Sequence, residues 1–145
     1  MKIIRHILHG NDGKPVHFVA TPNKGGIFFF FSPRYLIMHY TAATTGQSAI
    51  NWFANKAAKA SAHLLIGRDG TITQFAPFNT VTWHAGDSQW AGLAGLNKHS
   101  IGIELVNAGR LQKTSGNFVC AVDKRVVPDN EVMSARHKNE QSDFP

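Results

Sequence analysis

Two apolar segments, residues 35–40 and 100–106, constrain the fold of this chain more than any other feature. Residues 35–40 read Tyr-Leu-Ile-Met-His-Tyr, without the polar alternation of a strand that has one face in water. Such a run is typical of a central strand covered on both faces. The second segment reads Ser-Ile-Gly-Ile-Glu-Leu-Val and is a further predicted strand. We therefore expect a sheet built around these two strands.

Local signals between these segments add a helix and a hairpin. Apolar residues at helical spacing (Ala49, Ile50, Trp52 and Phe53) predict a helix that ends near Asn55, with Thr45 or Ser48 as its cap. Two strand-like runs, 62–66 and 71–75, bracket Gly-Arg-Asp-Gly, which is a strong hairpin signal. The combination predicts an α/β or α+β fold, with a mixed central sheet flanked by helices.

The remaining segments give weaker expectations. Residues 10–26 are rich in Gly, Pro and Asn and are predicted to be a loop. One Ile and four Phe at 27–31 favour a core strand over an apolar flap beside a cleft. Further predictions are a short strand at 81–84, an edge strand at 118–122, and a short helix or extended arm at 129–137.

Length and charge limit the classes of protein that fit. The chain has 145 residues, enough for one domain, and a net charge of +6. The first 68 residues hold eight basic side chains and one acidic, but these are scattered and no RNA-binding motif occurs. A solvated basic surface is thus favoured over a nucleic-acid partner. A single cysteine excludes an internal disulfide framework and a cysteine-rich zinc finger. No membrane span or secretion signal is expected, which predicts a cytoplasmic location.

Eight histidines are the main candidates for chemistry. Five are expected at the surface: His6, His9, His17, His99 and His137. His39, His63 and His84 lie in or beside apolar runs, and a buried imidazole needs partners or a metal for its ring nitrogens. One such histidine is more often structural, but three in separate predicted strands favour a shared polar site.

Glu104 stands between apolar neighbours in the second strand. Alternation places it on one face with Gly102, whose missing side chain leaves space for another group to approach. A buried Glu has a raised pKa that suits proton transfer. A solvent-facing edge strand is an equally good interpretation. Similarly, Trp83-His84-Ala85-Gly86 with nearby Trp90 suits the wall of a cleft for a sugar or peptide, or a turn with two packed indoles.

Four blocks in series carry a resemblance to a known family. They are residues 35–42 (YLIMHYTA), 61–70 (SAHLLIGRDG), 83–86 (WHAG) and 97–105 (NKHSIGIEL). In this order they resemble the zinc-dependent N-acetylmuramoyl-L-alanine amidases of the amidase-2 type, which are related to muropeptide-recycling amidases, phage lysozyme-like amidases and peptidoglycan recognition proteins.

The resemblance implies hydrolysis, by a zinc-activated water, of the amide between N-acetylmuramic acid and L-Ala of the stem peptide in peptidoglycan or muropeptides. It implies that His39 is the first zinc ligand and Glu104 the catalytic carboxylate. Trp83, His84 and Asn97 would line the substrate groove, and His63 would be structural or would lie just behind the metal ligands.

This sequence also departs from the family pattern in one respect. A second zinc histidine, a third ligand (Asp or Cys) and a lysine belong to a later segment, and the context of His137 does not match that histidine. We therefore expect a single amidase-like domain over 1–145, with an N-terminal arm of about 1–33 and without the usual C-terminal part. An incomplete metal site would favour the alternative of a non-catalytic peptidoglycan- or muropeptide-binding module. Loss of a covering helix would expose apolar sheet surface and favour a homodimer.

Overall fold

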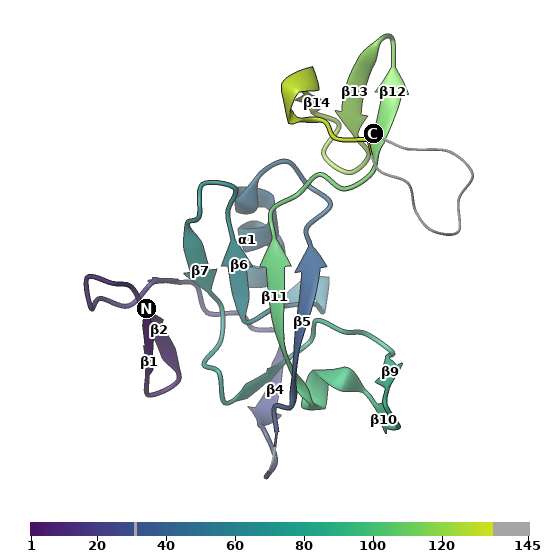
Figure 1. The fold of residues 1–145 in the computed structure, drawn as a ribbon. Coiled ribbons are helices and arrows are strands. Elements are labelled where there is room, and N and C mark those ends of the chain that lie inside the picture. Colours follow the sequence, from purple (N-terminus) through teal and green to yellow (C-terminus); the bar gives the residue numbers. More distant parts are fainter. Residues whose placement is uncertain (31, 135–145) are drawn as a thin grey trace.

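A five-stranded mixed sheet forms the centre of the molecule (Figure 1). The computed structural model describes residues 1–30 and 32–134. The sheet has the order β3-β7-β6-β11-β5, in which β11 runs parallel to both β5 and β6, and β6 runs antiparallel to β7. These strands are β3 (His17–Phe18), β5 (Tyr35–Tyr40), β6 (Leu64–Ile66), β7 (Ile72–Gln74) and β11 (Ser100–Leu105). The mixed sheet confirms the predicted fold class.

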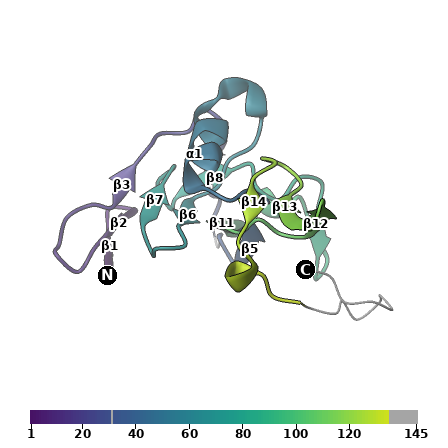
Figure 2. The same ribbon diagram turned by 90° about the horizontal axis from the view of Figure 1, so that it is seen from above.

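Helix α1 (Gly46–Ala54) lies on one side of this sheet, as the view from above shows (Figure 2). Its Ala49 and Phe53 pack on Leu65, Phe75 and other buried residues of the sheet. The rings of Phe53 and Phe75 meet edge to face at 5.2 Å. The helix confirms the prediction from apolar spacing, and Thr45 is its N-cap residue, but Thr45 makes no side-chain capping hydrogen bond.

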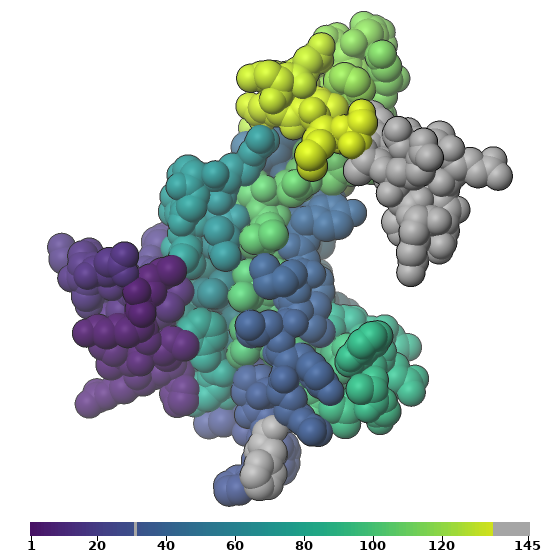
Figure 3. Space-filling view, viewed as in Figure 1, coloured from purple at the N-terminus to yellow at the C-terminus, as the bar shows by residue number. Residues whose placement is uncertain are grey.

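The opposite face of the sheet is open along β5, and this corrects the prediction of a strand covered on both faces. Exposure alternates along β5, and the side chains of Leu36, Met38 and Tyr40 are more than half exposed. Residues of β5 accordingly lie at the surface in the space-filling view (Figure 3). The physical reason is that α1 packs on the other side of the sheet, and β5 is also one of its two edge strands, whereas β11 is interior.

Smaller two-stranded sheets and short helices surround the centre. They comprise β1 (Lys2–Ile4) with β2 (Ile7–His9), β4 (Lys24–Ile27) with β8 (Thr80–Thr82), β9 (Gln89–Trp90) with β10 (Leu93–Ala94), and three short 3-10 helices, η1 (Lys56–Ala58), η2 (Leu96–Lys98) and η3 (Asp129–Glu131). The hairpin predicted over 62–75 is confirmed by β6 and β7, and the strand predicted near 81–84 by β8.

Two other sequence predictions are wrong. The run at 27–31 is not core, because Ile27, Phe29 and Phe30 are 70%, 89% and 88% exposed where β4 pairs only with β8 at the periphery. The segment at 118–122 is not an edge strand, because β13 (Asn117–Cys120) lies between β12 (Leu111–Thr114) and β14 (Val126–Val127). For the region 129–137, the described part holds η3, and residues 135–137 lie outside the described residues.

The three-stranded sheet β12-β13-β14 sits beyond the carboxyl ends of β5 and β11 (Figure 1). It has its own small apolar cluster of Leu111, Cys120 and Val127. Cys120 is buried and free, and its thiol donates to the carbonyl oxygen of Ala42 at 3.4 Å. This cluster therefore packs next to the loop that leads into α1.

Candidate functional site

His39 and Glu104 lie directly opposite each other on neighbouring parallel strands. They are register partners in the β5–β11 pairing, so their side chains project from the same face of the sheet. On the other side of β11, Glu104 is the register partner of Leu65, which belongs to the core beneath α1. The two residues that the sequence singled out therefore share the α1 side of the sheet.

The Glu104 carboxylate is partly buried beside a hollow. Its Oε2 atom is buried and has no hydrogen-bond partner among the described residues. Burial raises the pKa of this carboxyl group. Glu104 borders a hollow of about 460 Å³ whose other walls come from the β5–α1 loop, α1 and the turn after β13; they include Thr41, Ser48, Trp52, Phe53 and Val122. A buried carboxylate that opens to a hollow can exchange a proton with a bound molecule.

His39 contacts a second imidazole. Its Nε2 lies 3.0 Å from Nδ1 of His84, and the two rings meet edge to face at 5.2 Å between centroids. Burial lowers the pKa of His39. Burial, and then the neighbouring His39, lower the pKa of His84 to about 4. Both shifts favour the neutral imidazole.

The His84 ring occupies the space that Gly102 leaves open. A Cβ atom built on Gly102 would lie 2.3 Å from Cγ of His84. The glycine thus allows a group to approach its face of β11, as the sequence predicted, and that group is His84.

His63 has the structural role expected of it. The side chain is fully buried, and its Nε2 donates to the carbonyl oxygen of Thr80 at 2.8 Å. Its Nδ1 accepts from the hydroxyl of Thr82 at 2.9 Å and from the amide of Gly102 at 3.1 Å. Burial lowers its pKa to about 4. Because both ring nitrogens are engaged, His63 has no lone pair to offer a metal.

Trp83 and Asn97 lie next to the histidine pair. The side-chain oxygen of Asn97 accepts from the backbone amides of His84 and Ala85 at 2.9 and 2.7 Å, which fixes the turn that carries His84. The indole of Trp83 is 38% exposed, and its backbone amide donates to Ser61 Oγ. The structure therefore gives Asn97 a role in holding the turn, and contact of either residue with substrate stays a prediction.

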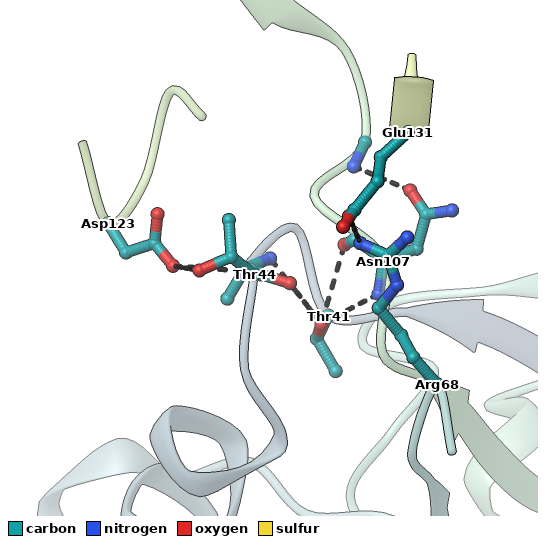
Figure 4. A network of polar contacts seen from close by, with 8 residues as sticks. Thr41, Thr44, Arg68, Asn107, Asp123 and Glu131 are labelled. Atoms are coloured by element: carbon teal, nitrogen blue, oxygen red, sulfur yellow. Dashed lines mark hydrogen bonds and ion pairs between the residues drawn. The ribbon is translucent and has the colours of Figure 1, made fainter. Parts of the chain in front are cut away.

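Sequence reasoning missed a polar network at the edge of the hollow (Figure 4). The Oδ2 atom of Asp123 accepts from the backbone amide and the hydroxyl of Thr44, at 2.8 and 2.5 Å. Burial raises the pKa of Asp123, but these hydrogen bonds outweigh it and hold the pKa well below its usual range. This clamp fastens the turn that carries Val122 to the loop before α1. The other carboxylate oxygen of Asp123 accepts from the backbone amide of Arg125, which is a local turn contact. Nothing in the sequence indicates the contact with Thr44.

A metal would find only part of its ligand set among the described residues. Within 1–30 and 32–134, no three His, Cys, Asp or Glu side chains converge on one point. A catalytic zinc is normally held by three protein ligands. The donor chemistry fits one corner of such a site, with the His39 imidazole as a ligand and the Glu104 carboxylate beside it. His137, the other histidine considered, lies outside the described residues.

Comparison with known proteins defines the class. The family model of N-acetylmuramoyl-L-alanine amidase matches residues 30–137, and the chain belongs to this family. Proteins of this family generally depend on zinc. The resemblance stated from the four sequence blocks is thereby confirmed.

Particular relatives are amidases of Escherichia coli (strain K12). The chain is 47% identical over 71 residues to 1,6-anhydro-N-acetylmuramyl-L-alanine amidase AmpD, and this match covers 48% of this chain and 39% of AmpD. It is 38% identical over 88 residues to N-acetylmuramoyl-L-alanine amidase AmiD, and that match covers 56% of this chain and 30% of AmiD. The chain therefore spans less than half the length of these curated relatives.

Solved structures agree on the fold. The crystal structure of a Se-Met AmpD derivative superposes with a TM-score of 0.61 at 28% identity, covering 74% of this chain and 66% of that one. PlyL has a TM-score of 0.50 at 20% identity, with 64% of this chain and 58% of PlyL covered, and it supports the fold alone.

Proposed function

We propose that this chain hydrolyses the amide bond between N-acetylmuramic acid and L-Ala of the stem peptide, in muropeptides or peptidoglycan. Family membership and the names of the amidase relatives support this reaction class. The observation that carries the proposal is the Glu104 carboxylate. It has a buried oxygen without a hydrogen-bond partner among the described residues, borders a hollow, and stands opposite His39 on the same sheet face.

In this proposal Glu104 holds and moves the proton of the attacking water, which its raised pKa favours. His39 would hold zinc as one of its ligands. Bound zinc supplies a water of lowered pKa and a positive charge near the developing oxyanion. The Trp83 indole would pack against the sugar or peptide, while Asn97 keeps His84 in place along the groove.

Release of free stem peptide tests the proposal. Purified chain is incubated with a muropeptide in the presence of Zn²⁺, and the products are separated by liquid chromatography and identified by mass spectrometry. We expect release by the wild type, and loss of release in Glu104→Gln and His39→Ala. Glu131→Gln is the matched control, because the Glu131 carboxylate forms an exposed ion pair with Arg68. Unchanged release by Glu104→Gln would remove Glu104 from the mechanism.

A second candidate function is a non-catalytic module that binds muropeptide or peptidoglycan. The observation that favours it is the donor count, because the described residues bring no three metal-binding side chains together. Sedimentation with insoluble peptidoglycan, without product release, would support this function. Absence of any binding would eliminate it.

Three further expectations stay predictions. A homodimer is supported by the exposed apolar side chains of Leu36, Met38 and Tyr40 on the open face of the sheet. The single-domain interpretation of 1–145 is supported by the family match over 30–137. A cytoplasmic location rests on the sequence alone. Among the described residues, no helix is long and apolar enough to cross a membrane.

A further inference from the structure

The geometry points to Ser100 and His84 as positioning residues that keep the ring proton of His39 on Nε2 and leave the lone pair on Nδ1. This inference deepens the proposed function, because it names the atom of His39 that is available to a metal. It rests on a row of hydrogen bonds that runs from the carbonyl oxygen of Leu96 through Ser100 and His84 to His39.

The first step concerns the proton of the Ser100 hydroxyl. Ser100 is fully buried, and its Oγ lies 2.6 Å from the carbonyl oxygen of Leu96, which can only accept. The hydroxyl has one proton and gives it to Leu96. Toward Nε2 of His84, 3.2 Å away, Ser100 Oγ must therefore act as the acceptor.

The second step fixes the tautomer of His84. Its Nε2 also lies 3.4 Å from the carbonyl oxygen of Ser100, a second group that can only accept. Both neighbours thus require a proton on Nε2 of His84. A neutral imidazole carries one proton, so Nδ1 of His84 is an acceptor.

The third step fixes the tautomer of His39. The Nε2 atom of His39 lies 3.0 Å from Nδ1 of His84, and an acceptor there requires that His39 Nε2 carries its proton. Neutral His39 then has its lone pair on Nδ1. Zinc binds the unprotonated nitrogen of an imidazole, and the hydrogen bond made by the other nitrogen decides which one that is.

The row of hydrogen bonds is fixed at both ends. Leu96 begins η2, and the next residue, Asn97, holds the backbone of His84 and Ala85. Gly102 provides the space for the His84 ring on β11. The imidazole of His84 is therefore positioned both through its backbone and through Nε2, as a group that orients another side chain requires.

Nitrogen-15 NMR of the histidine rings tests the inference on the intact chain. Long-range ¹⁵N–¹H correlation at neutral pH distinguishes a protonated from an unprotonated ring nitrogen. We expect protonated Nε2 and unprotonated Nδ1 for both His39 and His84 in the wild type. Ser100→Ala and His84→Phe should leave His39 as a mixture of tautomers, whereas His9→Phe, at a site outside this row, should leave it unchanged. A protonated Nδ1 on wild-type His39 would overturn the inference, whatever the variants do.

Zinc titration against a competing chelator separates this inference from the proposed function. Substitution of a residue that hydrogen-bonds to a metal ligand, directly or through another side chain, weakens metal binding by about 10–100-fold, and Ser100→Ala is expected to fall in that range. If the wild type has the expected tautomers but binds no zinc, the positioning role stands and the zinc-dependent function falls. If Ser100→Ala keeps both the wild-type His39 tautomer and the wild-type zinc affinity, Ser100 does not position the ring and the inference is refuted.

Discussion

The contact between Gly102 and the His84 ring makes a substitution at Gly102 a sharp test of the site geometry. In Gly102→Ala, the added Cβ would lie 2.3, 2.6 and 2.7 Å from three ring atoms of His84. Carbon atoms in ordinary contact are about 3.5–4.0 Å apart, so the ring must move by roughly 1 Å. A movement of that size breaks the 3.0 Å hydrogen bond between His84 and His39.

The expected cost follows from these contacts. Overpacking costs about 1–3 kcal/mol, and the lost hydrogen bond about 0.5–1.5 kcal/mol. Replacing a strand glycine by alanine returns about 0.5–1 kcal/mol through the unfolded state. We expect Gly102→Ala to lower the free energy of unfolding by about 1–3 kcal/mol.

Urea denaturation measures this change as a lower midpoint at constant slope. Gly26→Ala is the matched control, because Gly26 is also a strand glycine and has open space where its Cβ would stand. The double variant Gly102→Ala/His84→Ala removes the clash and should cost less than the sum of the two single variants. Additive costs, or a Gly102→Ala variant as stable as Gly26→Ala, would show that the ring does not occupy this space.

Three further predictions follow from the hydrogen bonds and pKa shifts of the site. Because the pKa of Glu104 is raised, the folded chain binds more protons than the unfolded chain just above pH 4.5. Stability therefore falls as the pH rises through this range. Glu104→Gln should flatten this pH dependence and should also abolish hydrolysis. The pKa of His63, lowered to about 4, acts oppositely, and stability should fall as pH drops from 6.5 toward 4, less so in His63→Gln, as urea midpoints at each pH will show. Asn97→Ala leaves two backbone amides without their acceptor and should cost about 1–3 kcal/mol in the same assay, unlike Asn51→Ala on the exposed face of α1.

Local sequence signals were sufficient for the elements whose contacts are close in the chain. The Gly-Arg-Asp-Gly turn predicted the β6–β7 hairpin, because both strands lie within a few residues of it. The apolar spacing of Ala49 and Phe53 predicted α1, because the side chains that pack on the sheet recur at the helical period.

Predictions failed where the outcome depends on distant partners. The apolar run of β5 indicates that its side chains prefer burial, but it does not say which faces of the sheet other elements cover, and α1 packs on one side. The prediction of a core strand at 27–31 failed because β4 pairs with β8 in a peripheral two-stranded sheet. Strand β3 went unnoticed in the predicted loop 10–26, because two residues paired with β7 leave no periodic pattern.

The sequence predicted which residues belong to the candidate site better than it predicted the hydrogen bonds between them. Alternation along β11 placed Glu104 and Gly102 on one face, as the structure does, since that follows from strand geometry alone. The hydrogen bond between His39 and His84, and the clamp between Thr44 and Asp123, join segments that only the folded chain brings together. No spacing in the sequence encodes these contacts.

The parallel pairing of β5 with β11 also has a consequence for the order of folding. Helix α1 and the β6–β7 hairpin are complete before β11 is reached along the chain, and they can form from contacts that are local in sequence. His39 and Glu104 come together only when β11 inserts between β5 and β6, which closes a long loop at an entropic cost. The candidate site therefore cannot form before its central strand has docked, although α1 and the β6–β7 hairpin can form without it.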